Sequence, residues 1–125
     1  SPQLNTIIKD KVHKREVVGK IDVVKFETAS MKGDTFTTYV VRITTASTGT
    51  SSNSRFVRRR YSEFETLFRK LKSSYPDLHG CIKFPVKSIM HSRTERLLAF
   101  NEFMNFVSVM RPLPKHVIEF IKPNE

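Results

Sequence analysis

The stretch RFVRRRYSEFETLFRKL, residues 55–71, changes its hydrophobic period at Tyr61. Before that point the side chains alternate between two faces, as in a β-strand, and one face carries Phe56, Arg58 and Arg60. From Tyr61 onwards the apolar residues Tyr61, Phe64, Phe68 and Leu71 recur three and four positions apart, with Leu67 beside them. That spacing is typical of an amphipathic helix. The stretch therefore predicts a strand that runs directly into a helix, with Arg60 and Tyr61 at the corner.

Two further strands are expected before this corner. Residues 16–28, EVVGKIDVVKFET, and residues 35–46, TFTTYVVRITTA, are rich in β-branched residues and alternate in part. A Gly-Asp turn signal lies between Met31 and Thr35, and residues 47–54, STGTSSNS, have the composition of a loop. Three consecutive strands joined by short connections predict an antiparallel meander.

Helices are expected after the corner. Ser62 with the acidic residues that follow it fits the start of the first helix, and Pro76 ends that helix. Residues 77–92 form a long loop, and loops of such length are often functional. Ser92 to Met110 reads as a second helix that opens on a capping box, and residues 115–121 read as a short last helix. The expected core stripe of the second helix is Leu97, Phe100, Met104 and Val107, and Phe103 and Phe106 are expected to widen it.

The predicted fold class is therefore α+β. A three-stranded antiparallel β-meander packs against a helical subdomain of three or more helices, with a proline-containing loop between the first two. Residues 1–15 read as a loosely ordered basic lead-in, and residues 16–122 as one domain. The chain starts Ser1-Pro2 and reads as a domain from a longer protein, and it is expected to be monomeric in isolation.

Composition narrows the classes of partner. The chain has 125 residues and a net charge of +10, from 22 Lys and Arg against 12 Asp and Glu. Such an excess favours an anionic partner: nucleic acid, an acidic membrane surface or an acidic protein. Cys81 is the single cysteine, so no internal disulfide can form and a reducing compartment is expected. No apolar run approaches the roughly 20 residues of a membrane-spanning helix.

Catalytic and nucleic-acid-binding signatures are weak. The sequence has no glycine-rich phosphate loop and no nucleophile or zinc-protease motif, and His79 and Cys81 lie two apart in one loop, a spacing that is usually coincidence. We therefore expect no enzyme activity, no cofactor and no metal site. Most aromatic residues fall on helical stripes that a core would bury, whereas a nucleic-acid-binding sheet exposes its aromatic residues. No nucleic acid is expected as a partner.

A membrane surface fits specific positions better. An arginine fork at the corner can bind a phosphate through two hydrogen bonds, and the adjacent tyrosine offers an apolar wall to a sugar-like ring. The long loop adds Lys83 and Lys87, and then the apolar pair Ile89 and Met90. Apolar residues next to lysines suit a peripheral membrane contact. The alternative is that Ile89 and Met90 pack into the core under the loop.

Three segments, in order, resemble the PX (phox homology) domain of sorting nexins and other phosphoinositide-binding proteins. They are RRRYSEFETLFRKL (residues 58–71), FPVK (84–87) and ERLLAFNEFMNFV (95–107). The resemblance extends from about Val17 to Ile121. It implies a peripheral protein of the cytoplasm that binds phosphatidylinositol 3-phosphate on endosomal membranes, as part of a larger trafficking or signalling protein.

The resemblance also implies roles for individual residues. Arg60 would bind the 3-phosphate, Tyr61 would pack against the inositol ring, Lys87 would meet the 1-phosphate, and Arg96 would hydrogen-bond the 4- and 5-hydroxyls. Ile89 and Met90 would insert into the membrane. The auxiliary basic residues are Lys83, Arg59 and Arg93.

The sequence departs from the family pattern in two places. The loop lacks the usual PxxP stretch, which leaves the choice between Lys83 and Lys87 open, and Leu97 stands where relatives carry a second basic residue. Arg55, Arg58 and Arg59 are interpreted as strand-surface residues that supply general positive charge. Two alternatives remain: a PX fold used for protein binding, and a basic domain that binds nucleic acid.

Overall fold

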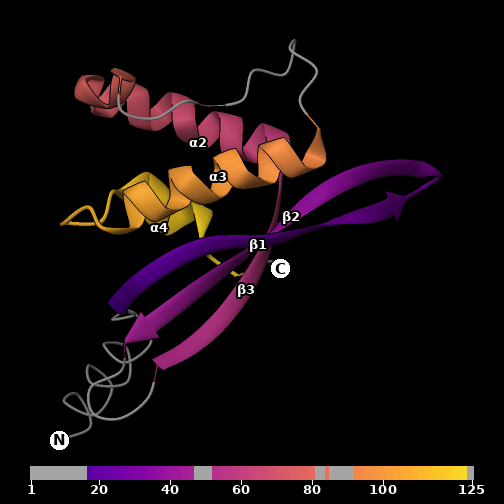
Figure 1. Ribbon diagram of the computed structural model, residues 1–125, viewed down its shortest axis with the longest axis horizontal. Helices are drawn as coiled ribbons and strands as arrows, with labels where there is room; N and C mark the ends of the chain where they lie inside the picture. Colours follow the sequence, from indigo (N-terminus) through magenta and orange to yellow (C-terminus); the bar gives the residue numbers. More distant parts are fainter. Residues whose placement is uncertain (1–16, 47–51, 81–83, 85–91, 124–125) are drawn as a thin grey trace, which may run out of the picture.

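Three antiparallel strands are followed by helices in the computed structural model, which describes residues 17–46, 52–80, 84 and 92–123. The strands are β1 (Val17–Met31), β2 (Asp34–Ala46) and β3 (Ser52–Arg60), and they lie in the order β1-β2-β3. The helices are α2 (Tyr61–Ser74), the 3-10 helix η1 (Pro76–Gly80), α3 (Arg93–Ser108) and α4 (Lys115–Phe120). Figure 1 shows the helices gathered on one side of the twisted sheet. The predicted α+β meander with a helical subdomain is confirmed.

The sheet explains why β1 alternates only in part. β1 and β2 form a long hairpin that closes at Met31 and Asp34, where Lys32 has φ 51° and Gly33 has φ 85°. Glycine suits the second of these positions because it adopts positive φ without steric cost. The pairing shifts register between Val18 and Lys20 and between Val23 and Lys25. Each irregularity changes which face the following residues occupy, so the period of two is interrupted.

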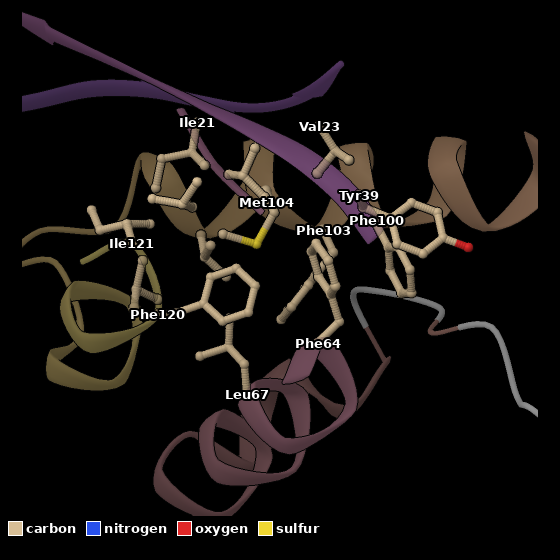
Figure 2. Packing of buried hydrophobic residues seen from close by; sticks show 14 of the residues in the cluster. Ile21, Val23, Tyr39, Phe64, Leu67, Phe100, Phe103, Met104, Phe120 and Ile121 are labelled. Atoms are coloured by element: carbon tan, nitrogen blue, oxygen red, sulfur yellow. The ribbon is translucent and has the colours of Figure 1, made fainter. Parts of the chain in front are cut away.

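The core lies between the helix-facing side of the sheet and helices α2, α3 and α4 (Figure 2). Its centre is a stack of aromatic rings: Phe64 from α2 and Phe100 from α3 are parallel, with centroids 4.1 Å apart, and the Tyr39 ring of β2 meets Phe100 edge-on at 4.9 Å. The largest fully buried side chains are Tyr39, Phe64, Phe100, Phe103, Ile21, Ile43, Leu71, Met104, Ile121, Val41, Val57 and Val107. This packing fixes where α3 crosses the sheet.

The helical stripes are largely as the spacing predicts. Tyr61, Phe64, Leu67 and Leu71 are the buried residues of α2, and Phe100, Phe103, Met104 and Val107 those of α3, together with Ser108. Phe106 is 37% exposed, so its predicted place in the stripe is wrong. Its neighbour Val107 lies one turn from Phe103 and takes the core position, which leaves Phe106 on the flank of the helix.

Two helix starts position the candidate site. Helix α2 begins at Tyr61, as the change of period predicts, with Arg60 as its N-cap residue and the Arg60 backbone N–H donating to Glu63 Oε1 at 2.8 Å. At α3 the predicted capping box is confirmed: the Glu95 N–H donates to Ser92 Oγ at 3.1 Å, and the Ser92 N–H donates to Glu95 Oε1 at 3.2 Å. The long loop predicted after Pro76 begins instead with the 3-10 helix η1.

Helix α3 is also tied to the edge of the sheet. The Val23 N–H of β1, beside the second register shift, donates to Asn101 Oδ1 at 2.9 Å. Just after the end of α3, Arg111 Nη2 donates to the Val18 carbonyl of β1 at 2.8 Å. These bonds satisfy edge groups that a bare strand would offer to another chain. Within the described ranges, none of the helices has the length and apolar character needed to cross a membrane.

Candidate functional site

Arg60 ends β3 and caps α2, so its side chain emerges at the strand-to-helix corner. Arg60 is exposed, and its guanidinium carbon lies 4.2 Å from the centroid of the Phe36 ring. The contact follows from the register: Arg60 is opposite Thr38 of β2, and Phe36 is two residues away on the same face. A guanidinium over an aromatic face is held by cation–π attraction while its N–H groups remain open at the edge.

Arg96 reaches the same corner from α3. Its guanidinium carbon lies 5.0 Å from the Tyr61 ring centroid, and Tyr61 follows Arg60 directly in the chain. The Tyr61 ring also contacts Phe84 and Phe100, each at 5.7 Å between centroids. Tyr61 is therefore only 8% exposed. Tyr61 follows Arg60 in the chain and supports Arg96, and little of its ring is open for an inositol ring to stack on.

The hydroxyl of Tyr39 lies beside Arg96 under the site. Burial raises the pKa of Tyr39 above its ordinary value of 10.0, while the neighbouring Arg96 guanidinium opposes this rise and Arg93 opposes it more weakly. Arg93 itself is exposed, in the first turn of α3, with its guanidinium carbon 6.0 Å from the Phe26 ring centroid. Arg60, Arg93 and Arg96 thus come from two elements and place positive charge around one corner of the sheet.

Arg59 points away from this corner and serves the fold. It is 8% exposed, Nε donates to the Phe120 carbonyl at 2.8 Å, and Nη2 donates to the Lys122 carbonyl at 2.6 Å. Burial lowers the pKa of its guanidinium, and Glu63 acts in the opposite sense. The interpretation of Arg59 as a strand-surface residue is therefore wrong. Since side chains alternate along β3, Arg59 faces the helices when Arg58 and Arg60 face outward.

The two earlier arginines of the cluster have partners of their own. Arg55 Nη1 donates to the Ile121 carbonyl, so this residue also holds the turn after α4. Arg58 Nε donates to Glu27 Oε1 at 2.7 Å across the outer face of the sheet, and this hydrogen bond lowers the pKa of Glu27. Arg58 is exposed, as expected, whereas Arg55 is half-buried.

Four predicted site residues lie outside the described residues: Lys83, Lys87, Ile89 and Met90. Phe84, which precedes Lys87 by three positions, is described. It is half-buried, and its ring stacks on Phe68 with centroids 4.8 Å apart and an interplanar angle of 20°. Together with its contact to Tyr61, this packing fixes one point of the loop against the candidate site.

Sequence reasoning missed three residues of the site: Phe36, Tyr39 and Phe84. Phe36 and Tyr39 were read as ordinary strand residues, and Phe84 only as part of a basic loop motif. Phe36 becomes a neighbour of Arg60 through the strand register, because pairing Thr38 with Arg60 brings Phe36 beside that arginine, and neither strand shows this register by itself. Nor does any sequence signal identify Phe84 as a neighbour of Tyr61.

A groove of about 740 Å³ lies elsewhere, between α2 and the C-terminal segment. Its lining residues are Arg59, Ser62, Glu63, Thr66, Leu67, Lys70, His116, Glu119, Phe120, Lys122 and Pro123. Both charge signs occur there, and Lys122 pairs with Glu119 at 2.9 Å, so the groove is a poorer match for a multiply charged anion than the arginine corner. In the part of the chain that the structure describes, no three His, Cys, Asp or Glu side chains gather as a metal site would need.

The fold, together with the arginines at the β3–α2 corner, is that of one class of protein, the PX domains. The family model described as PX domain matches residues 47–124, more than half of the chain, and the chain belongs to that family. PX domains are in general binding modules for phosphoinositides and membranes rather than enzymes. No curated protein sequence matches the chain at a significant level.

Solved structures agree on the fold. The chain is similar to the mouse SNX19 PX domain with bound sulphate ion, at 24% identity and a TM-score of 0.66, covering 87% of this chain and 99% of that one. It is also similar to a designed CISK-PX domain, at 21% identity and a TM-score of 0.63, covering 83% of this chain and 99% of that one.

Proposed function

We propose that this domain binds phosphatidylinositol 3-phosphate and thereby places a larger trafficking or signalling protein on endosomal membranes. The observation that carries the proposal is that two arginines from different elements are held by aromatic rings at the β3–α2 corner, Arg60 by Phe36 and Arg96 by Tyr61. Arg60 adjoins Tyr61 in the chain, and Arg96 lies 5.0 Å from its ring. A solvated charge run needs no such aromatic supports, whereas a site that binds a phosphate gains from arginines held in place.

In this proposal Arg60 binds the 3-phosphate. Its Phe36 contact holds the guanidinium by one face and so leaves the planar edge to form paired hydrogen bonds to phosphate oxygens. The Glu63 carboxylate does not compete for that edge in the capping interaction, because it accepts from the Arg60 backbone N–H. The anion would therefore meet a preorganised donor, which lowers the entropic cost of binding.

Arg96 would recognise the 4- and 5-hydroxyls. A guanidinium satisfied by hydroxyls leaves no room for phosphates at those positions, so selectivity comes partly from exclusion. Tyr61 would serve chiefly as the support between the two arginines, since it is 8% exposed. Lys87 would meet the 1-phosphate, and Arg93 and Lys83 would add to the local positive potential.

Membrane contact would be made by Ile89 and Met90, and in addition by the tip of the β1–β2 hairpin. Met31 at that tip is 63% exposed and is followed by Lys32. The tip lies beyond Phe36, on the strand that carries the Arg60 contact, and Figure 1 shows it on the same side as the N-terminus of α3. Apolar insertion beside basic residues suits the surface of an anionic bilayer.

A vesicle panel tests the proposal. The domain is mixed with phosphatidylcholine vesicles that contain one phosphorylated phosphatidylinositol each, at near-physiological salt, and the bound fraction is measured by sedimentation. We expect the tightest binding to phosphatidylinositol 3-phosphate and weaker binding when the 4- or 5-position carries a phosphate. Equal binding to every anionic vesicle, including phosphatidylserine alone, would contradict specific headgroup recognition and leave only charge attraction.

The two alternatives have distinct signatures in the same experiment. A PX fold used for protein binding would leave every vesicle unbound although Arg60 is intact. A nucleic-acid-binding domain would bind RNA or DNA in competition with soluble inositol phosphates and show no preference among vesicles. The proposal assigns lipid binding to a domain of residues 16–122 and treats residues 1–15 as a lead-in. Removal of residues 1–15 is therefore expected to leave the preference among vesicles unchanged.

A further inference from the structure

The Tyr39 side chain is held rigidly beneath the candidate site. The residue is 1% exposed, and its ring makes edge contacts with Phe26, Phe64 and Phe100 at centroid distances of 6.5, 5.9 and 4.9 Å. Three ring contacts leave the phenol no freedom to swing, so its oxygen occupies one place. Figure 2 shows this hydroxyl pointing away from the other labelled core side chains.

That oxygen is buried and has no hydrogen-bond partner among the described residues. The same holds for Nε of Arg96, which is also buried and without a partner in that part of the chain. Buried polar groups in folded proteins are nearly always satisfied by protein, ordered water or ligand, so each exception calls for an explanation. Here one exception is a donor and the other can accept, and they belong to neighbouring side chains.

The fold places the two side chains close together, because the Tyr39 ring contacts Phe100 at 4.9 Å and Phe100 lies one turn of α3 from Arg96. Arg96 acts on Tyr39 through both its hydrogen-bonding reach and its charge, and both effects lower the pKa that burial raises. The pair nevertheless lacks the alignment of a hydrogen bond in this structure, since both atoms lack a partner. At the same time the face of the Arg96 guanidinium lies over Tyr61, 5.0 Å from the ring centroid.

We propose that Tyr39 is a positioning residue for Arg96: when a headgroup binds, Arg96 Nε–H donates to the Tyr39 hydroxyl oxygen, and this bond directs both terminal nitrogens of the guanidinium at the ring hydroxyls. The inference rests on the proposed phosphoinositide function and deepens it. Arginine carries its five N–H donors in a rigid plane, so fixing Nε inward fixes the other two nitrogens outward. Tyr39 itself does not touch the ligand.

Selectivity follows from this arrangement. An Arg96 guanidinium held in one orientation fits two ring hydroxyls and excludes an added phosphate. A mobile guanidinium could turn to bind that phosphate. Loss of the Tyr39 hydroxyl should therefore weaken binding of the 3-phosphate lipid and also narrow its preference over the 3,5-bisphosphate lipid.

The test is a double-mutant cycle with Tyr39→Phe, Arg96→Ala and the double variant, using vesicles of phosphatidylcholine with phosphatidylinositol 3-phosphate or the 3,5-bisphosphate. Tyr39→Phe removes one oxygen and keeps the ring. We expect the dissociation constant for the 3-phosphate vesicles to rise about threefold to tenfold, the worth of one hydrogen bond. The ratio between the two lipids should fall, and Tyr39→Phe should have no further effect in the Arg96→Ala background. Tyr75→Phe, which deletes a hydroxyl from a 36% exposed residue, should change neither quantity.

Two outcomes would contradict the positioning role of Tyr39 while leaving the proposed function intact. One is full affinity and selectivity in Tyr39→Phe, and the other is an equal loss of affinity on Tyr39→Phe in the wild-type and Arg96→Ala backgrounds. If the wild-type domain binds no phosphoinositide vesicle, the proposed function fails first and this inference fails with it. A second measurement avoids variants altogether. In the wild-type domain, a soluble short-chain phosphatidylinositol 3-phosphate should slow solvent exchange of the Arg96 Nε proton, and unchanged exchange at saturating ligand would contradict the bond.

Discussion

Arg59 and Arg60 are adjacent in β3, yet their guanidinium groups act on opposite sides of the sheet. Arg59 is 8% exposed and donates to the carbonyls of Phe120 and Lys122. Arg60 is exposed and lies over the Phe36 ring at 4.2 Å. One residue therefore anchors the C-terminal helix, and its neighbour is free to bind an anion. The basic cluster is divided between stability and recognition, and substitutions within it should separate the two.

Replacing Arg59 should destabilise the fold. Arg59→Ala removes the donors that satisfy two backbone carbonyls near the end of α4, and leaving buried acceptors unsatisfied costs about 2 to 3 kcal/mol. Arg59→Lys should rescue little, because an ammonium group cannot reproduce the planar fork. Denaturant unfolding measures both variants. Arg69→Ala is a suitable control, since that side chain is exposed and only paired with Glu65 at 3.7 Å. A wild-type free energy of unfolding for Arg59→Ala would contradict the anchoring role.

Phe36 should tune affinity without contacting the headgroup. Phe36→Ala removes the ring on which the Arg60 guanidinium rests, and a cation–π contact at an exposed site is worth about 0.5 to 1 kcal/mol. We therefore expect the dissociation constant for phosphatidylinositol 3-phosphate vesicles to rise about twofold to fivefold, with the lipid preference retained. Phe56→Ala provides the comparison, because Phe56 is 53% exposed and lies on the same face of β3 as Arg60. Equal losses in both variants would remove the argument for a specific Phe36 contact.

The buried phenol predicts a pH dependence at the alkaline end. Burial raises the pKa of Tyr39 above 10.0, so the folded protein keeps this hydroxyl protonated at a pH where the unfolded chain ionises it. Its contribution to stability is complete below about pH 10 and falls as the pH rises further, because the unfolded state then releases the proton more readily. In a tyrosinate absorbance titration, one of the three tyrosines should ionise late. That late step should be missing in Tyr39→Phe; its persistence would assign the raised pKa to another residue.

Lys83 and Lys87 should contribute to lipid affinity in different ways. If Lys87 meets the 1-phosphate, Lys87→Ala should lower affinity for the 3-phosphate lipid by about tenfold and should do so at moderate as well as low salt. Lys83→Ala should lose only general attraction, roughly 1 kcal/mol or about fivefold at low salt, and this loss should shrink as salt is added. Vesicle sedimentation over a salt series measures both. The reverse order of effects would assign the contact to Lys83.

The sequence pattern predicts the elements well and their contacts poorly. The change of period at Tyr61 locates the β3–α2 corner, because alternation and helical spacing are local properties. The Arg59 side chain was misread because a run of arginines looks like a solvated face. Its inward direction depends on carbonyls more than 60 residues away, at Phe120 and Lys122. Phe36 and Tyr39 likewise join the site only through strand register and the crossing of α3, which no local pattern encodes.

The central claim is that Arg60 is the phosphate-binding residue of the cluster. Binding of wild type, Arg60→Ala and Arg58→Ala to phosphatidylinositol 3-phosphate vesicles at near-physiological salt tests it, since both variants lose one exposed positive charge from the same face of β3. We predict that Arg60→Ala abolishes specific binding with an unchanged melting temperature, while Arg58→Ala keeps most of it. Wild-type-like binding by Arg60→Ala, or equal losses in the two variants, would contradict the account.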